Sequence, residues 1–179
     1  MSAETNKALA RRLTEEAFNA GNIDVLDELL ATGIVNHDSA APESTVGLDA
    51  ARASIEGYRT AFPDLRVTIE DQIADDDRVV TRWSAKGTHQ GELMGMPATG
   101  KETTVTGITI DRIVDGRIAE SWTNWDTLGM LQQLGVVPAL ATASSDAHLP
   151  MSGGTFYAAM FPSLPQPRHM PCPECGESV

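Results

Sequence analysis

A change of hydrophobic period at Pro63 constrains the fold of this chain more than any other feature. Before Pro63, apolar residues recur at helical spacing, whereas Leu65, Val67 and Ile69 alternate with polar residues as in a half-buried strand. Helices that precede strands, rather than alternate with them, indicate an α+β fold. We therefore expect a curved antiparallel sheet that wraps around N-terminal helices and encloses a cone-shaped pocket.

Three helices are expected before Pro63. The first ends at Gly21, and the second is short and uses Asn22 as its N-cap. The third covers residues 48–62 and ends because a proline follows it. Between the second and the third helix, an apolar segment opens into a polar loop.

At least four antiparallel strands are expected after the helices. Asp115–Gly116 is a strong signal for a two-residue hairpin. The expected elements are a strand that contains residues 65–69, strands over 78–87, 103–114 and 117–125, and a closing helix over 128–134. Residues 88–101 contain four Gly or Pro positions and are expected to form a long connection.

The chain divides near Pro138 into a predicted domain, residues 1–137, and a Pro-rich tail, residues 138–179. The tail holds seven of the 10 prolines and little charge, so we expect it to be loosely ordered. Both cysteines, Cys172 and Cys175, lie there and form half of a zinc-ribbon pattern, so no metal site is expected. A body without cysteine fits a reducing cytoplasm.

The charge balance excludes two classes of partner. The chain has 13 Lys and Arg against 25 Asp and Glu, a net charge of −12. Nucleic acid and anionic membranes both require a basic surface, so neither is an expected partner. No apolar run approaches the length of a membrane span, and the polar N-terminus does not resemble a signal peptide.

The predicted hairpin places several carboxyl groups by register. If Asp115–Gly116 is the loop, Asp111 faces Glu120. Enclosure of that pair would raise one pKa, but we favour an exposed pair near the hairpin tip. The face that holds Glu120 continues to Asp126, at the far end of the strand, unless a bulge intervenes. The members of that face are Ile118, Glu120, Trp122, Asn124 and Asp126.

Two histidines are further candidates for proton transfer. His37 lies where an apolar segment opens into a loop, and its ordinary pKa allows proton transfer near neutrality. His89 stands close to glycines that would permit close approach of a ligand. Structural or exposed roles are the more common ones for both patterns. Motifs for metalloproteases, phosphate loops, dinucleotide binding and serine hydrolases are absent from the sequence.

Several segments together resemble the SnoaL-like polyketide cyclases. They are residues 36–38 (NHD), 62–64 (FPD), 87–92 (GTHQGE), 94–101 (MGMPATGK), 115–122 (DGRIAESW) and 125–129 (WDTLG). The resemblance covers about residues 5–137. It implies a nuclear-transport-factor-like, cystatin-like α+β barrel that acts as a homodimer without metal or organic cofactor.

The resemblance also implies an activity and a site. Characterised cyclases of the family close a ring of an aromatic polyketide ester by intramolecular aldol condensation, so a small hydrophobic or aromatic carbonyl substrate is expected. Asp126 is then the expected acid/base, with His89 and His37 as catalytic partners. Residues expected to contact the substrate are Asn36, Arg82, Trp83, Trp122 and Asn124.

Other functions of the same fold stay open. An isomerase of the ketosteroid type would use an early carboxylate, for which Asp38 is a candidate. An epoxide hydrolase would need an aspartate two residues after Arg82, where Ser84 stands instead. A non-catalytic binding module is the third alternative. For the homodimer, the exposed face of residues 104–110 is the expected contact.

Overall fold

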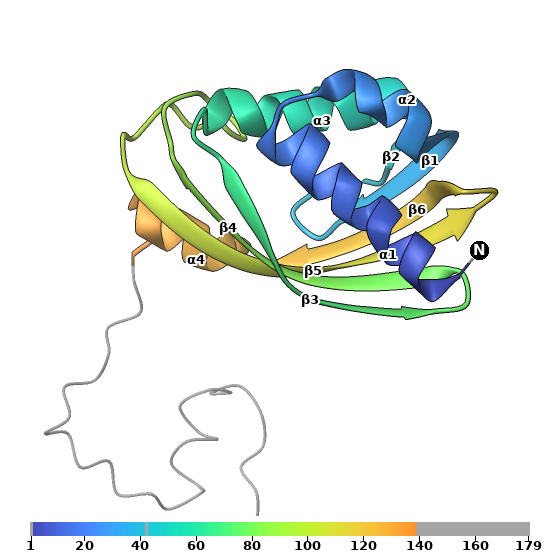
Figure 1. Cartoon of the computed structure of the whole chain (residues 1–179). Coiled ribbons are helices and arrows are strands. Elements are labelled where there is room, and N and C mark those ends of the chain that lie inside the picture. Colours follow the sequence, from blue (N-terminus) through green and yellow to red (C-terminus); the bar gives the residue numbers. More distant parts are fainter. Residues whose placement is uncertain (1, 42, 139–179) are drawn as a thin grey trace, which may run out of the picture. The chain divides into compact units, whose positions relative to one another are not determined.

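The computed structural model describes residues 2–41 and 43–138, which form one α+β body (Figure 1). Its helical elements are α1 (Ala3–Arg12), the π-helical η1 (Leu13–Asn19), the 3-10 turn η2 (Ile23–Val25), α2 (Leu26–Leu29), α3 (Leu48–Ala61) and α4 (Thr127–Leu134). Its strands are β1 (Leu30–Asp38), β2 (Thr45–Val46), β3 (Arg66–Asp75), β4 (Arg78–Thr88), β5 (Glu102–Val114) and β6 (Arg117–Trp125). The expected α+β class is therefore confirmed.

The strands form one six-stranded sheet in the order β2-β1-β6-β5-β4-β3. All neighbouring pairs are antiparallel except β1 and β6, which run parallel. Helices α1, α2 and α3 lie over one face of this sheet (Figure 1). That face is called the inner face below, and the opposite one the outer face.

An apolar core joins the helices to the inner face at the end nearest the β5–β6 turn. Leu26 and Leu29 of α2 are fully buried there against Ile118 of β6. A second apolar cluster surrounds the end of α3 and includes Phe62 and Met130. Between the two clusters, the inner face carries the polar side chains described in the next subsection.

Strand β1 was not expected from the sequence. Its residues follow a short helix directly, and its pairing with β6 joins segments more than eighty residues apart, such as Asn36 and Ser121. Hydrophobic periodicity reports local structure only, so it carries no signal for this parallel pairing. The strand nevertheless matters for the site because it carries Asn36 and Asp38.

The long connection between β4 and β5 is fixed at both ends. Backbone groups of His89 bond to Lys101 and Gly100, and the amides of Gln90 and Gly91 both bond to the carbonyl of Ala61. Gly91 lies so close to α3 that a Cβ atom there would stand 2.4 Å from the carbonyl oxygen of Thr60. This contact holds the connection against the end of α3.

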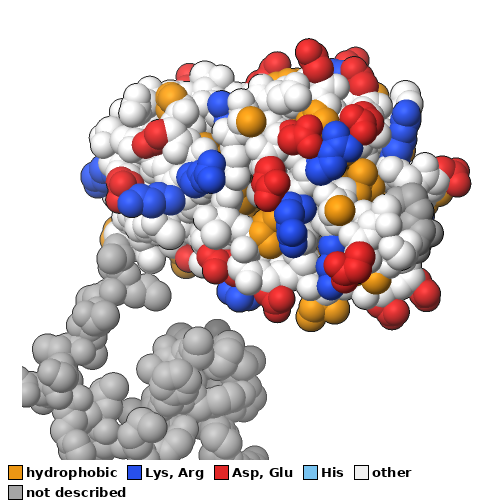
Figure 2. Space-filling model, in the orientation of Figure 1, with side chains coloured by type: hydrophobic (Ala, Val, Ile, Leu, Met, Phe, Trp, Pro, Cys, Tyr) orange, Lys and Arg blue, Asp and Glu red, His pale blue; other side chains and the backbone are white. Residues whose placement is uncertain are grey.

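Acidic and basic side chains are interspersed over the face of the body that Figure 2 shows, with hydrophobic side chains scattered between them. None of the described helices is long and apolar enough to cross a membrane. The predicted tail, residues 138–179, lies outside the described residues apart from Pro138. The loose order of the tail and the cytoplasmic location of the protein stay predictions.

Candidate functional site

The main cavity of the body is enclosed between the helices and the inner face of the sheet. Its volume is about 340 Å³, within the range of small-molecule sites. Most of its wall is apolar: η1, α3 and the connection between β4 and β5 contribute side chains such as Leu13, Ile55 and Met94. The polar groups of the cavity are concentrated on the sheet.

A row of polar side chains crosses the sheet on the cavity wall. The register places Asp38, Thr123, Thr109, Thr81 and Gln72 side by side on five strands, and all of them except Gln72 line the cavity. Thr109 and Thr123 hydrogen bond to each other at 3.1 Å, and the Gln72 amide donates to Thr81 at 3.1 Å. The threonine hydroxyls and the Asp38 carboxyl group give an otherwise apolar cavity a hydrogen-bonding side.

Asp38 anchors one end of this row. Its Oδ1 accepts hydrogen bonds from the Trp125 indole at 2.9 Å and from the Ala40 amide at 2.8 Å, and the Tyr58 hydroxyl donates to Oδ2 at 3.4 Å. Burial, with the nearby Asp38 charge, raises the pKa of Tyr58. Tyr58 therefore stays neutral and can act as a hydrogen-bond donor at neutral pH.

Trp83 lies across β5 because Gly107 has no side chain. A Cβ atom at Gly107 would stand 2.4 Å from the indole. The indole nitrogen donates to Thr109 Oγ1 at 3.0 Å, which ties Trp83 to the polar row. The local sequence thus combines a glycine and a tryptophan on neighbouring strands to build a flat aromatic part of the wall.

Asp111 lies on the same wall, two residues beyond Thr109 along β5. The residue is 4% exposed and lines the cavity, and its carboxyl group accepts a hydrogen bond from Ser121 Oγ at 2.5 Å. Burial raises its pKa to about 6, although the Ser121 hydrogen bond acts in the opposite direction. The expected exposed pair of Asp111 with Glu120 is therefore wrong.

A β-bulge explains this correction. The expected pairs of Val114 with Arg117 and of Ile113 with Ile118 are observed, but the next pair is Arg112 with Glu120, which leaves Ala119 unpaired. One extra residue reverses the facing of all later side chains in β6. Consequently Ser121, Thr123 and Trp125 line the cavity, whereas the expected face of Glu120, Trp122 and Asn124 does not.

The structure brings only some of the predicted site residues to the cavity. Asn36, His37 and Trp83 line it. Arg82, Trp122 and Asn124 do not line it, and neither do Asp126 and His89. The predicted convergence of Asp126, His89, His37 and Trp122 on one cavity is thus not observed.

Asp126 and His89 have structural contacts instead. Asp126 is exposed and caps α4, where its Oδ1 accepts from the Gly129 amide at 2.8 Å. His89 is fully buried against the Phe62 ring, and its Nδ1 accepts from the Thr99 amide at 3.3 Å. Both placements agree with the ordinary roles of an N-cap aspartate and a buried histidine.

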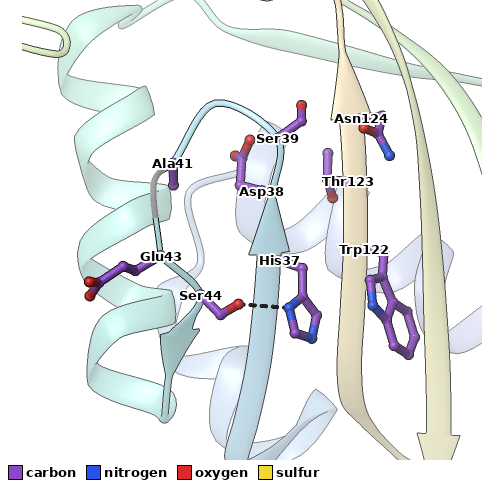
Figure 3. Close-up of a pocket in the computed structure, with 9 residues that line it drawn as sticks. All are labelled: His37, Asp38, Ser39, Ala41, Glu43, Ser44, Trp122, Thr123 and Asn124. Atoms are coloured by element: carbon purple, nitrogen blue, oxygen red, sulfur yellow. Dashed lines mark hydrogen bonds between the residues drawn. The ribbon is translucent and has the colours of Figure 1, made fainter.

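The His37 side chain belongs to a smaller pocket of about 230 Å³ (Figure 3). Its ring stacks on Trp122 with centroids 5.4 Å apart, and its Nδ1 lies 2.7 Å from Ser44 Oγ. Its Nε2 lies 3.0 Å from Glu120, which also accepts from Arg112, and these two partners lower the pKa of Glu120. The His37 ring is therefore engaged by side chains outside the main cavity.

The match to a family model decides where the chain belongs. The model of the SnoaL-like polyketide cyclases matches residues 8–134. The chain belongs to this family.

Within residues 2–41 and 43–138, no group of three or more His, Cys, Asp or Glu side chains is arranged to hold a metal ion.

Two relatives of this SnoaL-like chain are methyl ester cyclases by name. Aklanonic acid methyl ester cyclase DauD of Streptomyces sp. (strain C5) is 34% identical over 134 residues, which cover 71% of this chain and 80% of the relative. Nogalonic acid methyl ester cyclase of Streptomyces nogalater is 29% identical over 120 residues, which cover 66% of this chain and 90% of the relative.

Solved structures agree with the fold. TsrD from Streptomyces laurentii superimposes with a TM-score of 0.70 at 28% sequence identity. The matched region covers 76% of this chain and 99% of the TsrD chain. IdmH from Streptomyces antibioticus gives a TM-score of 0.63 at 35% sequence identity, and the matched region covers 73% of this chain and 98% of the IdmH chain. The family and fold expected from the sequence are thus confirmed.

Proposed function

We propose that this chain closes a ring in an aromatic polyketide ester by intramolecular aldol condensation. The inner cavity carries the proposal, because it combines apolar walls with one hydrogen-bonding side. Apolar walls suit a planar aromatic body, and the side formed by the polar row suits its carbonyl and hydroxyl groups. Membership of the SnoaL-like family supports the same reaction class.

The reaction needs few functional groups from the protein. A C–H group beside a carbonyl loses its proton, and the resulting enolate attacks a second carbonyl of the same molecule. A cavity that folds the substrate so that these two carbons meet removes much of the entropic barrier. Neutral donors, here Asn36, Tyr58 and the threonine hydroxyls, can stabilise the negative enolate oxygen.

The charges of the cavity favour an ester over a free acid. Asp38, Glu43 and Asp111 line it, against one lysine, Lys86. A substrate carboxylate would be repelled by these groups, whereas a methyl ester carries no charge. By name, DauD and the Streptomyces nogalater cyclase also act on methyl esters.

The test is incubation with an aromatic polyketide methyl ester and with its free acid at pH 8. We expect the ester to be converted to an isomer of equal mass and new retention time, and to bind at least about tenfold more tightly than the acid. Trp83→Leu should weaken both binding and conversion, whereas Ser84→Ala, on the next residue of β4, should not.

The outcomes separate the proposed reaction from its alternatives. Binding without conversion would identify a binding module. The structure gives the other two alternatives less support, because Asp38 has both oxygens engaged by hydrogen bonds and Arg82 does not line the cavity. Isomerisation of an unsaturated ketone, or hydrolysis of an epoxide, would still overturn the cyclase proposal.

We also propose that the outer face of the sheet forms a homodimer contact. Thr104, Thr106, Ile108 and Ile110 alternate along β5 with residues that line the cavity, and Ile108 is 47% exposed. Ile108 and Ile110 lie two residues apart on this face, and contiguous apolar surface of this kind is typical of an association surface. Light scattering at tens of micromolar should give twice the 19.1 kDa chain mass, and Ile108→Asp should halve it. Monomer mass for the unmodified chain would refute the dimer.

A further inference from the structure

Asp111 is a carboxyl enclosed without a balancing charge. It lies near the end of β5, between Val79 on β4 and Ser121 on β6. Within the part of the chain that the structure describes, it forms no ion pair, and Ser121 is its one hydrogen-bond partner. Enclosure of an unpaired carboxyl is costly, so its retention at this position needs a reason.

One oxygen of Asp111 stays available to a ligand. Ser121 bonds to Oδ1, and no described group bonds to Oδ2. Within residues 2–41 and 43–138, two polar side-chain atoms are fully buried without a hydrogen-bond partner, Asn6 Oδ1 and His89 Nε2. Asp111 Oδ2 has no hydrogen-bond partner either but is not among them, so it is not completely buried. Because Asp111 lines the main cavity, this oxygen can reach a bound molecule.

The other titratable groups of the cavity are placed differently. Asp38 is held by Trp125, Tyr58 and a backbone amide, so both its oxygens are engaged. Helix α1 and the following η1 face the cavity with uncharged groups only, namely Ala10, Leu13, Thr14 and Phe18. The remaining titratable groups on its wall are His37, Glu43, Tyr58 and Lys86. Asp111 alone combines deep enclosure with a free carboxyl oxygen.

We propose that Asp111 is the acid/base residue of the inner cavity, and that Ser121 positions its carboxyl group. This inference rests on the proposed cyclase function and names the group that moves its proton. Asp111 Oδ2 takes the proton from the C–H beside a substrate carbonyl, and the enolate carbon bonds to the second carbonyl carbon. The alkoxide formed there takes the proton back from Asp111. No atom or electron is gained or lost overall.

Asn36 is placed to assist the same step. It pairs in register with Ser121, which pairs with Asp111, so the three side chains form a short row across β1, β6 and β5. All three line the cavity. The Asn36 amide can donate to the enolate oxygen while Asp111 holds the proton.

The shifted pKa agrees with this role. At a value of about 6, the Asp111 carboxylate is a stronger base than an ordinary aspartate and is still largely ionised near neutrality. We therefore expect conversion to rise with pH through about 6 and then to level off. Ser121→Ala removes a hydrogen bond that lowers this pKa, so the rise should move to higher pH.

The main test is Asp111→Asn. Its control is Glu102→Gln, which also replaces a carboxyl group of β5 by an amide, but at an exposed position. We expect Asp111→Asn to lower conversion by about 10²–10⁴-fold, to remove the rise near pH 6 and to leave ester binding intact. Glu102→Gln should change none of these. A carboxyl resonance that titrates near pH 6 in carbon NMR should disappear only from Asp111→Asn.

A second measurement separates this proposal from the cyclase proposal. Exchange of the acidic C–H of the bound ester with deuterated water reports proton abstraction without ring closure. Exchange that depends on Asp111, without any cyclised product, would support Asp111 and reject the cyclase function. If Asp111→Asn retains conversion or exchange, the role of Asp111 is overturned. It is also overturned if both activities are lost in Asp126→Asn but not in Asp111→Asn. An unmodified chain that shows neither reaction would overturn both proposals.

Discussion

Asp111→Asn is expected to raise the free energy of unfolding at pH 8 by on the order of 3 kcal/mol. Burial raises the Asp111 pKa from its ordinary value of 3.8 to about 6, and one pKa unit corresponds to about 1.4 kcal/mol. The folded chain therefore binds this proton more tightly than the unfolded chain. The stability gained from this bound proton is complete below about pH 4 and is lost as pH rises through about 6. Asparagine is neutral throughout, so it avoids that loss.

Urea unfolding at pH 4, 6 and 8 checks this expectation. The stability difference between Asp111→Asn and the unmodified chain should be small at pH 4 and should grow up to about pH 7 before it levels off. Glu102→Gln serves as the control and should show no such growth. Parallel profiles for Asp111→Asn and the unmodified chain would mean that Asp111 is not enclosed in solution.

Gly107→Val is expected to weaken ligand binding by the inner cavity by about 10–100-fold. The new side chain would occupy the space of the Trp83 indole and force it into the cavity. The indole would then lose its hydrogen bond to Thr109. Overpacking of this kind also lowers stability by about 1–3 kcal/mol. Ester titration and urea unfolding measure the two effects.

A compensating variant isolates the cause. Combining Gly107→Val with Trp83→Leu should recover part of the lost stability, because the smaller side chain makes room for valine. Gly33→Ala is the matched control, since a Cβ atom at Gly33 meets nothing within 4 Å. Full ester binding by Gly107→Val would show that the indole does not shape the cavity.

Much of the sheet could be predicted because its signals are local. The Asp115–Gly116 turn gave the correct pairs next to the hairpin, including Ile113 with Ile118. The alternation after Pro63 correctly indicated strands in the second half of the chain. Strand β1 could not be found in this way, because its parallel partner β6 lies far away in the sequence.

The site was harder to predict than the fold. A regular hairpin would put Glu120 opposite Asp111, but the bulge at Ala119 puts Ser121 there instead. Nothing in residues 117–122 signals the extra residue, since alanine is compatible with a regular strand. Asn36 and Trp83 do line the cavity, and their positions do not depend on that bulge, but their contact with a substrate stays a prediction.

The bulge at Ala119 also has a consequence for how this protein family can diversify. Strand β6 encodes two alternative linings, one of Ser121, Thr123 and Trp125 and another of Glu120, Trp122 and Asn124. A deletion of one residue at this point would exchange them, with a carboxylate, an indole and an amide entering the cavity together. Evolution could thus replace the chemistry of a whole wall in one event, without altering any of the residues that compose it.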